Sequence, residues 1–190
     1  MDSSYSVFCG ERLIGSGKLS EMLRAGKAFL DSNHQANLLI FEDQTGRQLD
    51  FNFSGTLADV LERAEPAPER VGPGRPKLGV VSREVSLLPR HWEWLEEEPQ
   101  GISAALRRLV DEARKKNPGE QRARLGREAL SRFMTAMAGN FEHYEEATRA
   151  LFAKDNARFA HLIQHWPKDI RGHTLRMLAD FSKAEPAQGA

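Results

Sequence analysis

Short apolar runs and one helical repeat make up the first 64 residues. The run at 5–9 predicts a strand, which can turn back into a further strand at 12–14, and a third strand is expected at 38–41. Over 48–53 apolar and polar side chains alternate, which is typical of a strand with one buried face. The intervening helix is indicated by apolar residues at helical spacing: Leu19, Met22, Leu23, Phe29 and Leu30.

A short helix after Thr56 completes this first part of the chain. Thr56 can cap the helix, and its buried face comes from Leu57, Val60 and Leu61. The sequence therefore predicts a small α+β domain over residues 1–64, with the element order β-α-β-β-α.

The regular spacing of apolar residues stops between residues 65 and 79, where proline and glycine dominate. Proline fixes φ and lacks an amide donor, and glycine has little conformational preference. We therefore expect a basic linker or extended arm over 65–79, and we place a domain boundary there. The residues that carry this expectation are Pro66, Pro68, Gly72, Pro73, Gly74, Pro76 and Gly79.

The stretch 80–116 predicts one strand followed by two helices. Val85 and Leu87 alternate with polar neighbours as in a strand, and Pro89 stands where a helix can begin. Gly101 separates this helix from a second one, which Ser103 can cap. The second helix has an apolar stripe of Ala105, Leu106, Leu109, Val110 and Ala113, with Arg107, Arg108 and Arg114 facing outward.

The pattern is helical from 117 to 183. Asn117 and Pro118 resemble a helix start, the pair at 139–140 breaks the run, and Asp155 and Pro167 can open further helices. Three or four short antiparallel helices are the simplest packing, and 184–190 is expected to be a disordered tail. The predicted fold class is α+β: the N-terminal domain, a Pro/Gly arm, a strand plus two helices, then a C-terminal helical bundle.

Composition indicates an ordinary globular protein without a disulfide. The chain has 190 residues, of which 40% are hydrophobic, and Cys9 is its single cysteine, so no intrachain disulfide or multi-cysteine zinc site can form. No apolar run reaches the length of a membrane span, and the first residues lack the pattern of a signal peptide. We expect a cytoplasmic protein with no membrane association.

Charge is balanced in total but uneven along the chain. The 27 basic and 27 acidic residues give a net charge of zero, which argues against a protein dominated by attraction to nucleic acid. Basic residues nevertheless gather on both sides of an acidic helix that holds Glu93, Glu96, Glu97 and Glu98. Such asymmetry either indicates a polyanionic partner or reflects solvated helix faces.

The proline- and glycine-rich arm contains Gly74-Arg75-Pro76-Lys77, which resembles the core of an AT-hook. In that motif a narrow extended chain places arginine in the minor groove of A·T-rich DNA. This resemblance implies that Arg75 and Lys77 contact the minor groove or phosphates. The hook has a second arginine before its glycine, whereas this chain has Pro73 there, and the alternative is a plain linker.

The order of a strand and two helices over 81–116 resembles the ribbon-helix-helix family of DNA-binding proteins. In that family two chains pair their strands and lay the ribbon in the major groove. The resemblance implies a homodimer in which Arg83, Glu84 and Ser86 face the bases. It also implies that the Ser103 amides, with Arg107 and Arg108, hold the DNA backbone.

The strand departs from this family in register. The family places apolar residues one, three and five positions before the proline, and this chain has Leu88, Ser86 and Glu84 there. A shift by one residue reverses the side chains that face the core, so a bulge would be needed to restore the ribbon. Two alternatives stay open: a helix-turn-helix over 92–114, or a strand and two helices that pack on the neighbouring domain.

Nothing in the sequence indicates an enzyme, a metal or a cofactor. His161 and His165 stand four residues apart, but no HExxH motif or cysteine accompanies them. Glu142, Glu145 and Glu146 lie near a histidine without the matching helix of a di-iron site. No phosphate-binding loop or nucleophile elbow is present. We therefore expect no catalytic residue.

The whole chain also resembles a proteobacterial family of unknown function. Four segments spread between Ser6 and Asp180 carry this likeness: FEDQTGRQLDFN, GRPKLGVVSREVSLLPRHWEWL, LRRLVDEARK and HWPKDIRGH. The resemblance implies no activity. The leading hypothesis is a DNA-binding transcriptional regulator, and the alternative is a non-enzymatic interaction or scaffold protein with a protein partner.

Overall fold

The computed structural model describes residues 3–64, 81, 83–116 and 118–183. The chain divides into two compact units: Met1–Pro66 together with Gly119–Ala190, called here the main unit, and Ala67–Pro118, called the hairpin unit. The predicted α+β class is confirmed, with an antiparallel sheet followed by helices. The predicted arm at 65–79 and tail at 184–190 lie outside the described residues.

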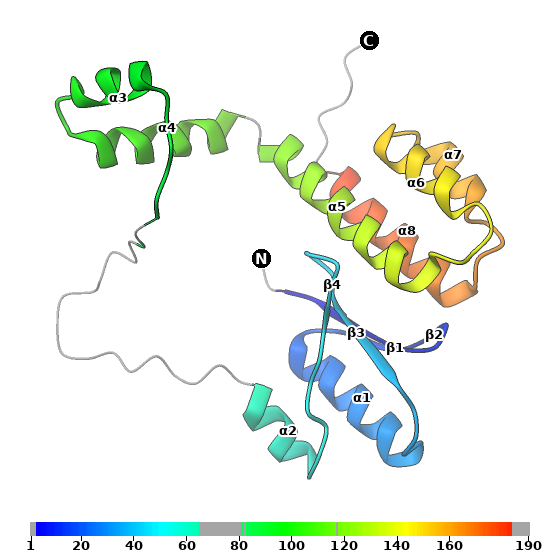
Figure 1. The fold of residues 1–190 in the computed structure, drawn as a ribbon. Coiled ribbons are helices and arrows are strands. Elements are labelled where there is room, and N and C mark those ends of the chain that lie inside the picture. The colour runs from blue at the N-terminus through cyan, green and yellow to red at the C-terminus, as the bar shows by residue number, and fades with distance from the viewer. Residues whose placement is uncertain (1–2, 65–80, 82, 117, 184–190) are drawn as a thin grey trace. The chain divides into compact units, whose positions relative to one another are not determined.

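The main unit begins with a four-stranded antiparallel sheet in the order β2-β1-β3-β4 (Figure 1). The turn at Gly10 joins β1 and β2 directly, so the observed order is β-β-α-β-β-α instead of the predicted β-α-β-β-α. The bounds are β1 Tyr5–Cys9, β2 Arg12–Gly17, α1 Leu19–Ser32, β3 Leu38–Glu42, β4 Arg47–Leu49 and α2 Leu57–Ala64.

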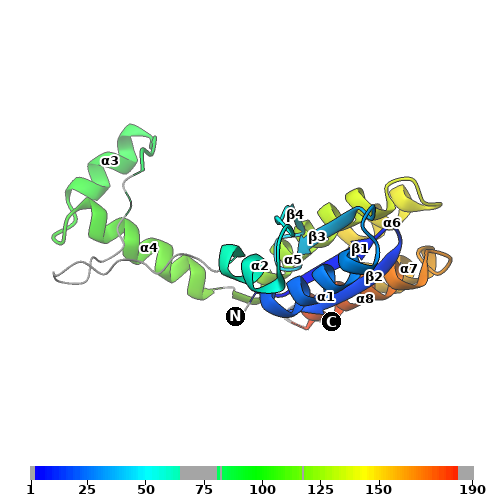
Figure 2. The same ribbon diagram turned by 90° about the horizontal axis from the view of Figure 1, so that it is seen from below.

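Both faces of the sheet are buried, because successive apolar side chains of a strand point to opposite sides of it. In β1 and β3, Val7 and Ile40 point to one side, where they pack with Met22 of α1. Phe8 and Phe41 point to the other side, toward the C-terminal helices. Figures 1 and 2 show α1 on one face of the sheet and α5 and α8 on the other. The sheet is therefore the middle layer of three.

Four C-terminal helices complete the main unit. The bounds are α5 Pro118–Ala138, α6 Tyr144–Phe152, α7 Asn156–Leu162 and α8 Lys168–Ser182. Helices α5, α7 and α8 begin at or beside the predicted positions, whereas α6 begins after His143, whose φ is 61°, without a predicted cap. α5 ends just before the predicted break at Gly139, and the Asp155 carboxylate accepts a hydrogen bond of 3.0 Å from the Arg158 amide at the start of α7. Of the helices in the described part of the chain, none combines the length and apolar character needed to cross a membrane.

The sheet and these helices share one hydrophobic core. The ring of Phe133, on α5, lies 5.6 Å from Phe8 and 5.1 Å from Phe41, centroid to centroid. The sequence had placed the N-terminal domain and the helical region in separate segments, and the shared core joins them. Its members come from both segments: Phe8, Phe41, Leu130, Phe133, Met134, Leu151, Phe159, Ile163, Ile170 and Phe181.

The β3–β4 turn fits tightly against α5. Gly46 has φ of 65°, and a Cβ atom there would lie 1.9 Å from the Ala129 carbonyl oxygen. Beside it, the Arg132 guanidinium donates a hydrogen bond of 2.7 Å to the Thr45 carbonyl oxygen. Glycine is needed here for two reasons, the left-handed backbone and the lack of space.

Replacing Gly46 with alanine is therefore expected to destabilise the main unit strongly. Gly10 offers a matched control, because its φ is 55° but an added Cβ would meet nothing within 4 Å. Gly10→Ala should cost about 1 kcal/mol through backbone strain alone. Gly46→Ala should cost on the order of 3 kcal/mol, since steric overlap is added. Urea unfolding measures both, and equal costs would contradict the packing of this turn on α5.

Candidate functional site

The hairpin unit contains all of the residues that the sequence assigned to DNA contact, and the structure describes all of them except two. It consists of α3 Pro89–Glu96 and α4 Ile102–Lys116, joined by a turn at Gly101, where φ is 81°. Pro89 stands at the first position of α3, as predicted, and Leu95 and Ala105 are the side chains that the two helices bury. Arg75 and Lys77 lie outside the described residues.

The predicted strand is not formed in the single chain. Residues 83–88 are neither helical nor paired in a sheet, and Arg83, Glu84 and Ser86 are exposed to solvent. The physical reason is that an isolated strand has no stability without a hydrogen-bonding edge, and the ribbon of that family forms only between two chains. In the single chain these three side chains are thus exposed and have no strand to orient them.

The second group of predicted DNA contacts lies on α4 and is partly engaged within the hairpin. Arg108 forms ion pairs with Glu98, at 3.2 Å, and with Glu112, at 3.3 Å. The hydrogen bond that Arg108 donates to Glu112, followed by the charge of Glu98, raises the pKa of Arg108 above its ordinary value. The Nε of Arg107 donates to the Ser103 carbonyl oxygen. Two nitrogens of the Arg108 guanidinium therefore contact carboxylates, while about half of this side chain stays exposed.

Charge in the hairpin is balanced but separated between the two helices. Residues 83–116 hold equal numbers of acidic and basic side chains, so their net charge is zero. The acidic residues are Glu84, Glu93, Glu96, Glu97, Glu98, Asp111 and Glu112; the basic ones are Arg83, Arg90, Arg107, Arg108, Arg114, Lys115 and Lys116. The C-terminal half of α3 is thus acidic, and the last turn of α4 is basic.

The hairpin also exposes apolar side chains. Leu109 is 38% exposed, Val110 is 55% exposed and Trp94 is 45% exposed. For Leu109 and Val110 the cause is a difference in helix length: at about 1.5 Å per residue, α3 spans roughly 12 Å and α4 roughly 22 Å. α3 can therefore cover only the first half of the apolar stripe of α4.

A buried polar cluster in the main unit was not predicted. His173, on α8, is 1% exposed; its Nδ1 accepts a hydrogen bond from Arg176 and lies 3.5 Å from the Ser6 hydroxyl. Its Nε2 faces the Asp43 carboxylate at 3.5 Å. The helical period of α8, which places His173 on the same face as Ile170 and Met177, was the sequence signal that could have found it.

This cluster has the residue types of a catalytic triad but not the access that catalysis needs. Ser6 is fully buried in β1, and no substrate could reach its hydroxyl without opening the core. Burial, followed by the charge of Arg176, lowers the pKa of His173 to about 3. Burial also raises the pKa of Asp43, against hydrogen bonds from Ser4 and Ser6. The cluster fixes the sheet against α8.

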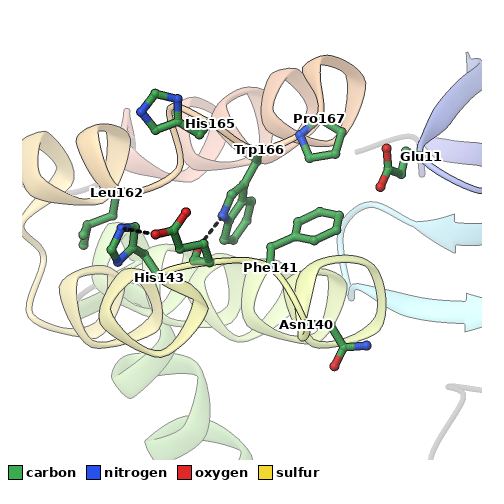
Figure 3. Close-up of a pocket in the computed structure, with 9 residues that line it drawn as sticks. Glu11, Asn140, Phe141, His143, Leu162, His165, Trp166 and Pro167 are labelled. Atoms are coloured by element: carbon green, nitrogen blue, oxygen red, sulfur yellow. Dashed lines mark hydrogen bonds and ion pairs between the residues drawn. The ribbon is translucent and has the colours of Figure 1, made fainter.

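A cavity of about 300 Å³ opens in the main unit where α6 and α8 begin (Figure 3). Its aromatic side consists of Phe141 and Trp166, with ring centroids 5.7 Å apart, and the indole nitrogen donates to the Glu142 carbonyl oxygen. His165 lines the cavity, whereas His161 does not, so these two histidines do not meet there. Within the described ranges, no group of three His, Cys, Asp or Glu could hold a metal.

The electrostatics of this cavity do not favour one ligand class. Two helix N-termini border it, at His143 and Pro167, and would attract an anion. Glu11 and Glu142 line the same space and would repel it. The hairpin is therefore the better candidate for function.

The buried histidine predicts how stability depends on pH. In the unfolded chain His173 binds a proton near its ordinary pKa of 6.5, whereas in the folded state it stays neutral down to about pH 3. Between these values the unfolded state binds more protons, so stability is complete above pH 6.5 and is lost as pH falls. From pH 7.5 to pH 5.5 the loss should be about 1.4 kcal/mol.

His173→Gln should remove this component of the pH dependence, because glutamine forms hydrogen bonds but does not titrate. Urea unfolding of both proteins at pH 7.5 and pH 5.5 gives the comparison. The raised pKa of Asp43 works in the opposite direction, because it favours the folded state as pH falls further. Asp43 is present in both proteins, so the comparison between them reports on His173. Parallel pH profiles for the two proteins would show that His173 is not buried in its neutral form.

Comparison with known proteins gives a family without a described activity. No curated protein and no solved structure matches the chain. A family model described as "Uncharacterized protein conserved in bacteria (DUF2239)" matches residues 4–179, which include both the main unit and the hairpin unit. The resemblance to a bacterial family of unknown function is thus confirmed, and the chain belongs to this family of uncharacterized proteins conserved in bacteria.

Proposed function

We propose that the chain is a non-enzymatic interaction protein, in which the hairpin unit contacts a protein partner and the main unit is its stable support. The observation that carries the proposal is the apolar stripe of α4, which continues beyond the part that α3 covers. Ala105 is buried, and Leu109, one helical turn further along the same face, is exposed.

The hairpin unit is too small to be stabilised by its own core. Leu95 and Ala105 are its buried side chains within 83–116, and alanine contributes little apolar area. Isolated helices of the length of α3 are marginal in water, and two such helices need a larger buried surface to be stable. A protein surface laid over Leu109 and Val110 would supply that surface.

The interaction function predicts that a protein covers this stripe inside the cell. A photo-activated amino acid, p-benzoylphenylalanine, placed at Leu109 should form covalent adducts with that protein. The same residue at Asp111, which is exposed on the opposite face of α4, is the matched control and should give far fewer adducts. Gel electrophoresis of irradiated cells reads out both positions. Equal yields of adduct at the two positions, or no adduct at either of them, would contradict the proposal.

DNA binding is the second candidate, and the basic last turn of α4 favours it. Arg114, Lys115 and Lys116 are exposed, and among the described contacts none of them has an ion-pair partner. Three free cations on one turn can contact phosphates. The net charge of zero over 83–116 and the commitment of Arg108 to two carboxylates place this function second.

The DNA function predicts a specific order among arginine variants. In fluorescence anisotropy with a labelled duplex, affinity should fall steeply as salt rises, because phosphate contacts release counterions. Arg107→Ala should weaken binding more than Arg108→Ala, since Arg108 is held by Glu98 and Glu112. Lack of binding at low salt, or equal effects of the two substitutions, would count against a DNA interface on α4.

A further inference from the structure

We infer that the protein covering the stripe is a second copy of this chain, with the two α4 helices packed antiparallel about a two-fold axis at Leu109. This inference rests on the proposed interaction function and names its partner. It follows from three properties of the hairpin: the position of the stripe, the separation of charge and the balance between the two signs.

The stripe has the symmetry that such pairing needs. α4 runs from Ile102 to Lys116, and Leu109 stands at its midpoint. In an antiparallel pair crossing at this residue, each Leu109 meets its own copy. Residues at equal distances from Leu109 then face one another, so the small side chain of Ala113 would lie opposite Ala105 of the other copy. Because α3 of that copy covers Ala105, the contact on either side of Leu109 is between α4 of one copy and α3 of the other.

Charge selects the antiparallel orientation. In that orientation the last turn of α4, with Lys115 and Lys116, lies beside the turn between α3 and α4 of the other copy. The acidic end of α3 is there, and Glu96 and Glu97 are exposed on it. A parallel pair would instead bring the basic ends of both copies together, which is repulsive. Complementary charges at the ends of an apolar seam set the orientation of paired helices.

The balance of charge favours a second copy over an unrelated protein. A two-fold interface uses the same surface on both sides, so that surface must be complementary to itself. The hairpin meets this condition, because it carries one apolar stripe together with an acidic end and a basic end. A surface adapted to an acidic or a basic partner would carry an excess of one sign, and residues 83–116 carry none.

Disulfide formation at the predicted axis tests this arrangement in the purified full-length protein. Cys9 is the single native cysteine, so Cys9→Ser gives a background without thiols. In that background Leu109→Cys should give a covalent dimer on mild oxidation, because the two positions meet at the axis. Asp111→Cys is the matched control; it is only two residues away but faces outward, and it should give no covalent dimer.

Charge reversal tests the orientation separately. Lys115→Glu with Lys116→Glu should weaken the dimer at least tenfold, and so should Glu96→Lys with Glu97→Lys. Mixing the two variants should restore pairing as a heterodimer, since each reversed end then meets an opposite charge. Light scattering on a size-exclusion column follows the mass of each sample, and circular dichroism confirms that each variant is folded.

The outcomes separate this inference from the function on which it rests. A protein that stays monomeric at high concentration, with no disulfide at position 109, overturns the second-copy inference. If photo-crosslinking at Leu109 then yields adducts with another protein, the interaction function stands with a different partner. If neither experiment yields a contact at Leu109, both proposals fall.

Discussion

The packing of Phe133 between Phe8 and Phe41 is the interaction on which the main unit depends. The three rings come from α5, β1 and β3, and every pair of centroids lies within 6.2 Å. Beyond the area that they bury, such aromatic pairs contribute roughly 0.5–1.5 kcal/mol each. Phe133 lies more than 90 positions beyond Phe8 and Phe41 in the sequence. Its packing on both rings therefore means that the sheet and the C-terminal helices can only be stable together.

This shared core explains how the hairpin unit can exist with so little core of its own. The chain leaves the main unit after Pro66 and returns to it at Gly119, so both ends of the intervening segment are anchored in one stable body. Insertions of this kind are tolerated because closing a longer loop costs little additional entropy. Anchoring keeps the hairpin within the chain, and the surface that covers the apolar stripe of α4 would supply the burial that its own core lacks.

The elements of the main unit could be predicted from the sequence because their patterns are local. Strands β1 to β3 follow the apolar runs, whereas β4 ends at Leu49 and takes in only the first part of the alternating stretch 48–53. Thr56 caps α2 by accepting a hydrogen bond from the Asp59 amide. The shared core could not be predicted, because periodicity shows which face of an element is buried but not which element covers it. The burial of His173 was missed for the same reason.

In the candidate site, too, the features with a local sequence signal could be predicted and those that depend on distant contacts could not. The two helices of the hairpin are present near the predicted positions, since proline and glycine mark their ends. The strand predicted over Val85 and Leu87 is not formed in the single chain, because its pairing depends on a second edge rather than on its own residues. The engagement of Arg108 with Glu98 was also beyond prediction, because the two lie on different parts of the hairpin.

The central claim is that the stripe on α4 is covered by a second copy. Hydrogen–deuterium exchange on the full-length protein at low and high concentration tests it without any substitution. The account predicts that amides of α4 around Leu109 exchange more slowly at high concentration, while those of α8, in the core of the main unit, do not change. Identical exchange of α4 at both concentrations would contradict it.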